Sequence, residues 1–298
     1  MSAVFSVILP THNRAATLDR AVRSVLAQGC GDFELIVIDD GSTDATPEVL
    51  ARYGAESRMR VVRTPCQGAA RARNLGASVA RGRYLAFQDS DDEWMPGKLE
   101  RARVALEAAG PETAVFCGDM IRVMPDGRTM PFPAPRAIET GRLISEVTKD
   151  FQVLNIGIQT AVIRRECFEA VGGFDAGLRR YIDMELFVRL ALRYRFVHAG
   201  EVLATYHDGP GISKDRAALV DARRYLIKKY NGPLRECPEH LAHQYLRLSV
   251  ALDYDGRKLS SVACALRGWL IAPGRIRAGE LGSAIVGRWA RIGRSRFR

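Results

Sequence analysis

Short apolar runs alternate with amphipathic stretches of helical length through the first half of the chain, and this alternation limits the possible folds. The run at residues 4–9 is almost entirely apolar, as in a strand that is buried on both faces. The predicted strands are residues 4–9, 35–38, 59–63 and 84–88, and the predicted helices are residues 17–28, a segment starting at Thr46, residues 69–80 and residues 97–109. This order predicts an α/β fold with a mostly parallel central sheet flanked by helices.

The second half of the chain is less regular. We expect strands at residues 115–117 and 160–163, a helix at residues 183–194, and short strands at residues 196–198 and 202–206. From about residue 217 the pattern is helical, rich in Arg and Leu, and shows no further strand. We therefore predict one α/β domain over residues 1–212 and a basic helical region over residues 213–298.

Polar clusters recur at the points where the predicted strands end. The first is residues 11–14, the second is Asp39-Asp40, and the third is residues 89–92. In open α/β sheets, ligands bind just beyond the carboxyl ends of the strands. We therefore expect the three clusters to converge on one ligand-binding edge.

The third cluster holds three carboxylates within four residues, Asp89, Asp91 and Asp92. Carboxylates this close repel one another unless a cation, a hydrogen-bond donor or water lies between them. A hard divalent ion with oxygen ligands is the usual solution, and such an ion often accompanies a phosphate-bearing substrate. The alternative is a solvated acidic loop before a helix that has Pro96 near its start.

The common nucleotide-binding fingerprints are missing. No Gly-x-Gly-x-x-Gly follows the first strand, and no Gly-x-x-x-x-Gly-Lys-Ser/Thr is present, which argues against a dinucleotide dehydrogenase and a P-loop NTPase. Residues 10–14 also lack the Gly-rich loop and lysine of a sugar nucleotidyltransferase. A nucleotide site built from carboxylates and a metal remains.

Five segments together resemble glycosyltransferase family 2. They are residues 6–14, 32–44, 67–76, 89–94 and 172–175, which read SVILPTHNR, DFELIVIDDGSTD, QGAARARNLG, DSDDEW and GGFD. The segments follow the family's order and spacing over roughly residues 4–207. The resemblance implies a GT-A fold, which is Rossmann-like, with the helical region as a C-terminal extension. It also implies a nucleotide-sugar-binding half at residues 1–95 and an acceptor half at residues 96–212.

The resemblance implies an inverting enzyme that moves a sugar from a nucleotide diphosphate, commonly UDP, to an acceptor hydroxyl. The acceptor would be a saccharide or a lipid-linked saccharide in cell-surface polysaccharide or glycolipid synthesis. The implied donor-binding residues are Pro10, Thr11, Asn13, Arg14, Asp39, Asp40, Arg71, Arg73, Asn74, Asp89, Ser90 and Asp92. Asp40 would accept a hydrogen bond from the base. Because Arg71 and Arg73 point to different faces of the predicted helix, the alternative for at least one of them is a solvated side chain.

By the same resemblance, Asp91 coordinates Mg²⁺ or Mn²⁺, and His207 contacts the metal or the diphosphate. Asp89 would contact the ribose or the donor sugar, and Asp92 the donor sugar or the acceptor. For His207 the alternative is an ordinary hydrogen-bonded loop histidine.

Asp183 occupies the position of the family's catalytic base. Its alternative role is that of a helix N-cap, which is compatible with catalysis. Ile182 replaces the glutamate that usually precedes the base, which leaves the acceptor side less certain. Two other functions stay open: a nucleotide-sugar or polyol-phosphate enzyme that performs another transfer, and a catalytically inactive nucleotide-sugar-binding or scaffold relative.

The formal charge of +10 is concentrated at the C-terminus, where residues 267–298 hold eight arginines and one acid, Glu280. Arginines interleaved with Trp and aliphatic residues fit peripheral contact with an anionic membrane; docking on the catalytic domain is the alternative. No nucleic-acid-binding motif accompanies this charge, so we expect no nucleic-acid partner. No apolar run reaches the roughly 18 to 20 residues that span a bilayer, and no signal peptide is recognised. Six scattered cysteines fit free thiols in the cytosol. We therefore expect a cytoplasmic protein, peripheral on the inner face of the plasma membrane.

Overall fold

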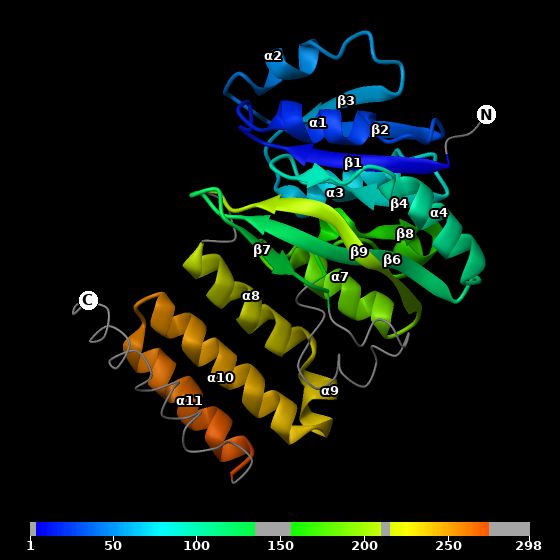
Figure 1. The fold of residues 1–298 in the computed structure, drawn as a ribbon. Helices are drawn as coiled ribbons and strands as arrows, with labels where there is room; N and C mark the ends of the chain where they lie inside the picture. Colours follow the sequence, from blue (N-terminus) through cyan, green and yellow to red (C-terminus); the bar gives the residue numbers. More distant parts are fainter. Residues whose placement is uncertain (1–3, 135–155, 210–214, 274–298) are drawn as a thin grey trace. The chain divides into compact units, whose positions relative to one another are not determined.

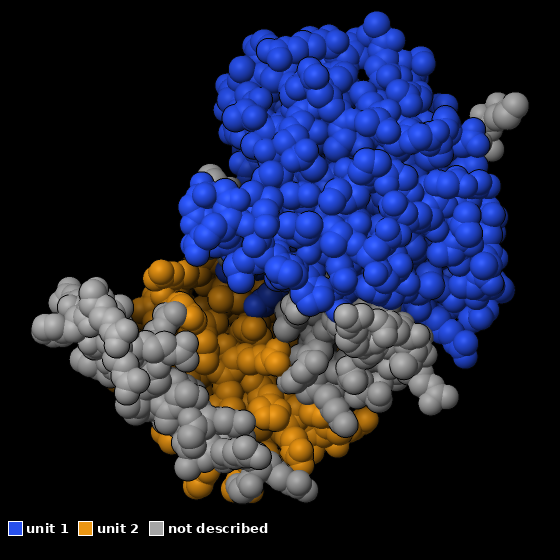
Figure 2. All heavy atoms as spheres, viewed as in Figure 1, with its two compact units in different colours: residues 1–147, 151–209 blue, residues 148–150, 210–298 orange. Residues whose placement is uncertain are grey.

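The computed structural model describes residues 4–134, 156–209 and 215–273. They form two compact units (Figure 2). Unit 1 holds the described residues up to 209, and unit 2 holds residues 215–273. Residues 135–155 of the predicted acceptor half, and the tail beyond residue 273 with its arginines, lie outside the described residues.

One curled sheet runs through the whole of unit 1 (Figure 1). Its strand order is β3-β2-β1-β4-β8-β6-β9-β5, with β7 paired to β6. The strands are β1 Phe5–Thr11, β2 Phe33–Asp40, β3 Met59–Thr64, β4 Tyr84–Phe87, β5 Glu93–Trp94, β6 Thr113–Val123, β7 Thr129–Phe132, β8 Val162–Arg164 and β9 Arg195–His207. The first four strands are parallel, β6 runs parallel to β9, and the other pairs are antiparallel. The predicted α/β fold is confirmed, with a parallel first half and a mixed second half.

Helices flank the sheet where the apolar periodicity predicts them. Those of unit 1 are α1 Leu18–Leu26, α2 Thr46–Ala51, α3 Ala69–Ser78, α4 Lys98–Ala108, α6 Arg165–Ala170 and α7 Ile182–Ala191, with a 3₁₀ turn, η3, at Ile158–Thr160. Helix α3 lies very close to β1, because a Cβ atom at Gly76 would come within 2.5 Å of the Ile8 side chain. The glycine therefore sets how closely α3 approaches the sheet.

Three strands differ from the sequence prediction. The two short strands expected at residues 196–198 and 202–206 form one strand, β9, whose pairing with β6 shifts register near Asp119. Strand β7 was not predicted. It contains Pro131, which is tolerated because β7 pairs with β6 alone among the described strands. Strand β5, which lies within the acidic segment and pairs with β9, was not predicted either.

Unit 2 is helical, as its composition predicts. Its helices are α8 Arg216–Lys229, α9 Asn231–Glu236, α10 Pro238–Tyr254 and α11 Lys258–Ile271. Small residues bring α10 and α11 together: the Ser261 hydroxyl donates to the Ser249 carbonyl oxygen at 2.8 Å, and a Cβ atom at Gly268 would lie 2.9 Å from the Ala242 carbonyl oxygen. Among the described helices, none is both long and apolar enough to cross a membrane.

Candidate active site

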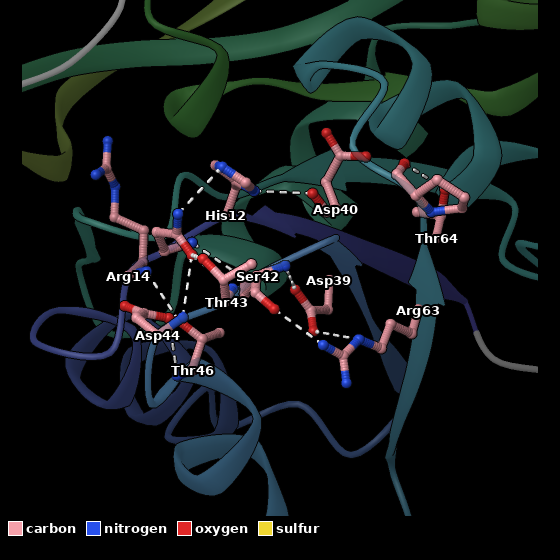
Figure 3. A network of polar contacts seen from close by, with 12 residues as sticks. His12, Arg14, Asp39, Asp40, Ser42, Thr43, Asp44, Thr46, Arg63 and Thr64 are labelled. Carbon is pink, nitrogen blue, oxygen red and sulfur yellow. Dashed lines mark hydrogen bonds and ion pairs between the residues drawn. The ribbon is translucent and has the colours of Figure 1, made fainter.

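The loop after β1 is tied to the loop after β2 by Asn13. Its side-chain oxygen accepts hydrogen bonds from the main-chain amides of Thr43, at 2.8 Å, and Asp44, at 3.3 Å (Figure 3). Asn13 itself has a φ of 51°, a left-handed conformation that asparagine tolerates better than most residues. Its main-chain amide donates to the Ser42 hydroxyl at 3.0 Å. The predicted donor-binding residue Asn13 therefore shapes two loops at the end of the sheet.

Asp39 and Asp40, at the end of β2, point in opposite directions, as consecutive strand residues do (Figure 3). The Asp39 carboxylate accepts from the Ser42 amide at 2.9 Å and lies 3.4 Å from the Arg63 guanidinium. The two oxygens of Asp40 accept from the main-chain amides of Gln67, at 3.0 Å, and Gly68, at 2.8 Å. Asp39 thus orders the turn after β2, whereas Asp40 orders the entry to α3.

The end of β1 meets the acidic segment through Arg14. Its Nε atom lies 3.7 Å from a carboxylate oxygen of Asp91. Pro10 and Thr11, which precede it, are buried in the sheet. The Thr11 hydroxyl is buried and has no hydrogen-bond partner within the described part of the chain. An unsatisfied hydroxyl at a strand end is a group that a ligand can engage.

Arg73, on α3, contacts the third cluster. The side chain is buried, and its guanidinium donates to the Asp89 carboxylate at 2.5 Å. The guanidinium also lies 5.6 Å from the ring centre of Phe174. Arg71, on another face of the helix, is exposed, as we expected for one of the two arginines.

Asp183 lies in the first turn of α7, where the charges of Arg73 and Asp89 both act on the pKa of its carboxyl group. Burial raises the pKa of its carboxyl group, the positive charge of Arg73 opposes the rise, and the negative charge of Asp89 adds to it. The N-cap of α7 is Tyr181, with a φ of 61°, and the helix begins at Ile182. The alternative role of Asp183 as a helix N-cap is therefore wrong, because the helix starts one residue before it.

Asn74 pairs with the turn before α7, and its predicted contact with the donor stays a prediction. Its amide nitrogen donates to the Phe174 carbonyl oxygen at 2.8 Å, and its amide oxygen accepts from the Phe174 main-chain nitrogen at 2.9 Å. A Cβ atom at Gly173, where φ is 69°, would lie 2.8 Å from the same amide oxygen. The Arg189 guanidinium donates to the Gly173 carbonyl oxygen at 2.6 Å and to the buried Glu185 carboxylate at 2.7 Å. These contacts fix α7, and with it Asp183, relative to α3.

Asp92 is fully buried and both of its carboxylate oxygens accept hydrogen bonds. The donors are the His207 main-chain amide and the Gln159 side chain, each at 2.8 Å. Burial, and next the negative charge of Asp89, raise the pKa of Asp92. Gln159 in turn accepts, through its main-chain oxygen, a 2.7 Å hydrogen bond from the fully buried amine of Lys98. The structure gives Asp92 partners from the protein itself; the predicted contact with sugar remains a prediction.

The predicted metal ligands, Asp91 and His207, have different surroundings. Burial raises the pKa of the Asp91 carboxyl group, and the charge of Asp89 adds to this rise. The His207 imidazole is 2.7 Å from a Glu93 carboxylate oxygen. Among residues 4–134, 156–209 and 215–273, no three His, Cys, Asp or Glu side chains are grouped as metal ligands. Ser90, between the first two carboxylates, is buried.

The sequence analysis missed two residues that contribute to the site, Arg20 and Gln159. The Arg20 guanidinium, on α1, donates to the Asp91 carbonyl oxygen at 2.6 Å and lies 3.2 Å from the Glu93 carboxylate. Gln159 reaches Asp92 from 67 residues away. Arg20 is a basic residue in the first turn of α1, the helix that follows the first cluster, and this position could have pointed to it. Nothing in the sequence marks Gln159.

The model of the family described as glycosyl transferase family 2 matches residues 6–172. This match spans the first and third clusters, α3 and the start of the Gly172-Gly173 turn, and covers more than half of the chain.

This chain belongs to glycosyltransferase family 2.

Curated relatives agree with this membership. The chain is 31% identical over 217 residues to a PGL/p-HBAD biosynthesis glycosyltransferase found in Mycobacterium bovis and Mycobacterium tuberculosis, covering 70% of this chain and 79% of the relative. It is 43% identical over 95 residues to an uncharacterized glycosyltransferase of Rickettsia conorii, covering 32% of this chain and 16% of that protein. The chain is a glycosyltransferase.

Solved structures confirm the GT-A fold. TarS residues 1–349 of S. aureus, in complex with UDP-GlcNAc, superimpose with a TM-score of 0.63 at 17% identity over 98% of this chain and 91% of that chain. The mannosyltransferase PcManGT from Pyrobaculum calidifontis, in complex with GDP-Man and Mn²⁺, gives a TM-score of 0.58 at 18% identity over 98% of this chain and 81% of that chain.

Proposed function

We propose that this family 2 glycosyltransferase is inverting and metal-dependent, and that it moves a sugar from a nucleotide diphosphate, with UDP as the expected carrier, to an acceptor hydroxyl. The observation that carries the proposal is the position of Arg73. Its guanidinium is 2.5 Å from Asp89 of the acidic segment, and its charge acts on Asp183 of α7. One arginine thereby links the proposed donor side to the proposed base.

On the donor side, we assign the base and ribose to the ends of β1 and β2. Two backbone amides already occupy the Asp40 carboxylate, but a carboxylate has about four lone-pair sites, so it can still accept from a uracil N–H. The buried Thr11 hydroxyl supports ligand contact at the same edge. The structures of similar fold bind UDP-GlcNAc in one case and GDP-Man in the other, both nucleotide diphosphate sugars.

The carboxylate chemistry of the acidic segment fits a hard divalent cation such as Mg²⁺ or Mn²⁺. Asp91 would hold it, with Asp89 beside it, because burial and like charge make an ionised Asp91 unfavourable until a cation arrives. Such ions commonly use one or two protein carboxylates and take the other ligands from substrate phosphates and water. When bound, the ion would stabilise the charge of the departing diphosphate. We include His207 as a secondary ligand, for which its contact with Glu93 would have to open.

On the acceptor side, we assign the general base to Asp183. Arg73 opposes the rise in its pKa, so the carboxylate stays more readily ionised than its burial alone would allow. An ionised Asp183 can take the proton from the attacking hydroxyl as the new bond forms. Inversion follows if this hydroxyl attacks from the face opposite the diphosphate.

We further assign the acceptor to saccharides or lipid-linked saccharides of cell-surface polysaccharide or glycolipid synthesis. The basic C-terminal region, residues 213–298, would then hold the enzyme on the inner face of the plasma membrane from the cytoplasm. Its arginine content supports attraction to an anionic lipid surface.

The test is a screen of nucleotide sugars by thermal shift with and without Mn²⁺, followed by hydrolysis and transfer assays with the best donor. We expect UDP-sugars to stabilise the protein only with the metal, and Asp91→Asn to abolish this effect. Asp183→Asn should keep donor binding and lose transfer. Full transfer activity in Asp183→Asn would refute the base assignment. Donor binding without turnover by the wild-type chain would favour the inactive, nucleotide-sugar-binding alternative.

A further inference from the structure

Helix α11 has an apolar face that points away from its packing partner. Its buried residues, Ser261, Ala265 and Gly268, recur at helical spacing and pack against α10 (Figure 1). Another side of the helix, about 120° around from the buried one at 100° per residue, carries large apolar residues at positions 259, 262, 266, 269 and 270. At 100° per residue, these five fall within an arc of about 100°.

We call this set, Leu259, Val262, Leu266, Trp269 and Leu270, the outer face of α11. The face is strongly exposed: Leu259 is 89% and Leu270 68% accessible, and the other three members range from 38% to 46%. Single exposed apolar residues are common, but five on one helix face form a continuous patch, which usually marks an interaction site. Ile271, by contrast, packs against the α10–α11 core.

Charge around the outer face differs between the two ends of α11. At the start, Lys258 is 2.6 Å from Asp253 and Arg257 is 2.7 Å from Asp255, so the basic groups are balanced. Towards the end, Arg267 is exposed and lies over the Tyr245 ring. Beyond Pro273 the sequence continues with Arg275 and Arg277, and residues 274–298 hold seven arginines against one acid. The exposed Trp269-Leu270 end therefore borders the most cationic part of the chain.

We propose that the outer face of α11 is a docking surface for an anionic lipid bilayer, in whose interface the helix lies parallel to the membrane plane. A helix with Trp and Leu on one side and arginine at its edge has the composition of an interfacial helix. A second copy of the chain fits less well, because it would bring two arginine-rich C-terminal segments together. The inference deepens the membrane contact proposed above and names its residues, but it does not depend on the assigned sugar chemistry.

The test uses flotation of the full chain with vesicles of phosphatidylcholine alone and of phosphatidylcholine mixed with phosphatidylglycerol. We expect the wild-type chain to float with the mixed vesicles, less so at high salt, and not with phosphatidylcholine alone. In the variant Leu259→Gln/Leu266→Gln/Leu270→Gln, partitioning should fall at least about tenfold, because three apolar side chains no longer enter the interface. Glutamine is a good helix former and the sites are exposed, so the circular dichroism spectrum should not change.

A matched control replaces three exposed apolar residues of unit 1, in Val61→Gln/Val104→Gln/Met130→Gln; these side chains are 45%, 57% and 54% accessible. The control should float like the wild type. Trp269→Phe should remove most of the blue shift in tryptophan fluorescence that the mixed vesicles produce.

Three results would overturn the proposal. The first is a wild-type chain that floats with neither vesicle, and the second is an α11 variant that floats as well as the wild type. The third is an α11 variant that changes only the molar mass in solution, which would make the outer face a contact between copies of the chain. Deletion of residues 274–298 that abolishes flotation, while the α11 variant retains it, would assign binding to the tail instead. Because no donor or acceptor is present, none of these results bears on the proposed transfer reaction.

Discussion

The carboxylate of Asp92 accepts a 2.8 Å hydrogen bond from the main-chain amide of His207, which is 115 residues further along the chain. The contact joins the acidic segment to the end of β9, beside the β5–β9 pairing. Adjacent carboxylates therefore have different surroundings: Asp92 is buried and has two donors, whereas Asp91 is partly exposed and has a long ion pair with Arg14. The first prediction follows from this difference.

Asp92→Ala should destabilise the fold by about 2 kcal/mol, because its two buried donors, the His207 amide and the Gln159 side chain, then lose their acceptors. Asp91→Asn should not lower the free energy of unfolding, since a long, partly exposed ion pair contributes little and burial already disfavours the ionised carboxylate. Urea unfolding of both variants measures the difference. Equal stabilities for the two variants would show that the Asp92 contacts do not hold the segment.

The pH dependence of transfer should report Asp183. Burial raises the pKa of this carboxyl group, Arg73 opposes the rise, and Asp89 adds to it. A base must be ionised, so kcat/KM should fall with decreasing pH through a midpoint above about 3.9, the ordinary value for aspartate. Arg73→Met removes the opposing charge and should move the midpoint to higher pH. The exposed Arg71→Met serves as the control and should leave the midpoint in place; a shift as large as that of Arg73→Met would contradict the assignment.

Asp183→Asn should make the protein more stable at neutral pH while it abolishes transfer. Because the folded-state pKa is raised, the ionised carboxylate destabilises the fold. This penalty is fully present above the folded-state pKa and disappears as the pH falls below the unfolded value. We expect a rise in Tm of about 2 °C at pH 7, and little difference from the wild type near pH 3. A lower Tm at pH 7 would show that the carboxylate is a net structural contact.

Gly172 and Gly173 offer a matched pair for testing the link between α3 and α7. Both have positive φ, 84° and 69°, so alanine should cost about 1 kcal/mol at either site through backbone strain. At Gly173 the new Cβ atom would also lie 2.8 Å from the Asn74 side-chain oxygen, whereas the Cβ of Gly172→Ala meets nothing within 4 Å. Chemical denaturation should show Gly173→Ala to be the less stable by at least about another 1 kcal/mol. Transfer activity should fall in Gly173→Ala alone, because the pairing of Asn74 with Phe174 is disturbed.

The sequence predicted the strands and helices of the first half well, because each apolar run is short, buried and bounded by turn residues. It predicted β9 as two strands, because Gly200 interrupts the apolar pattern. In the structure β9 is one strand, and β6 pairs with both of its parts across a register shift. The family resemblance correctly implied the fold and the family. Asn13 connects the ends of β1 and β2, and Arg14 connects the end of β1 to the acidic segment, as expected where parallel strands end.

The roles of individual polar residues were harder to predict, because they depend on partners far away in the chain. Asn74 pairs with Phe174 exactly 100 positions later in the numbering, and Gln159 reaches back to Asp92. No local pattern encodes such pairs. A polar residue in a family motif can equally hold the site in shape or contact the substrate, and only the contacts distinguish the two.

The shared sheet of unit 1 limits how this enzyme could be divided. A cut after Trp94 would separate β4 from β8 and β5 from β9, which leaves a newly exposed edge on each of these four strands in place of one continuous sheet. Neither fragment should be soluble when expressed alone. Co-expressed, the two pieces would have matching edges, so this break point is a rational place to build a split reporter whose reassembly restores sugar transfer.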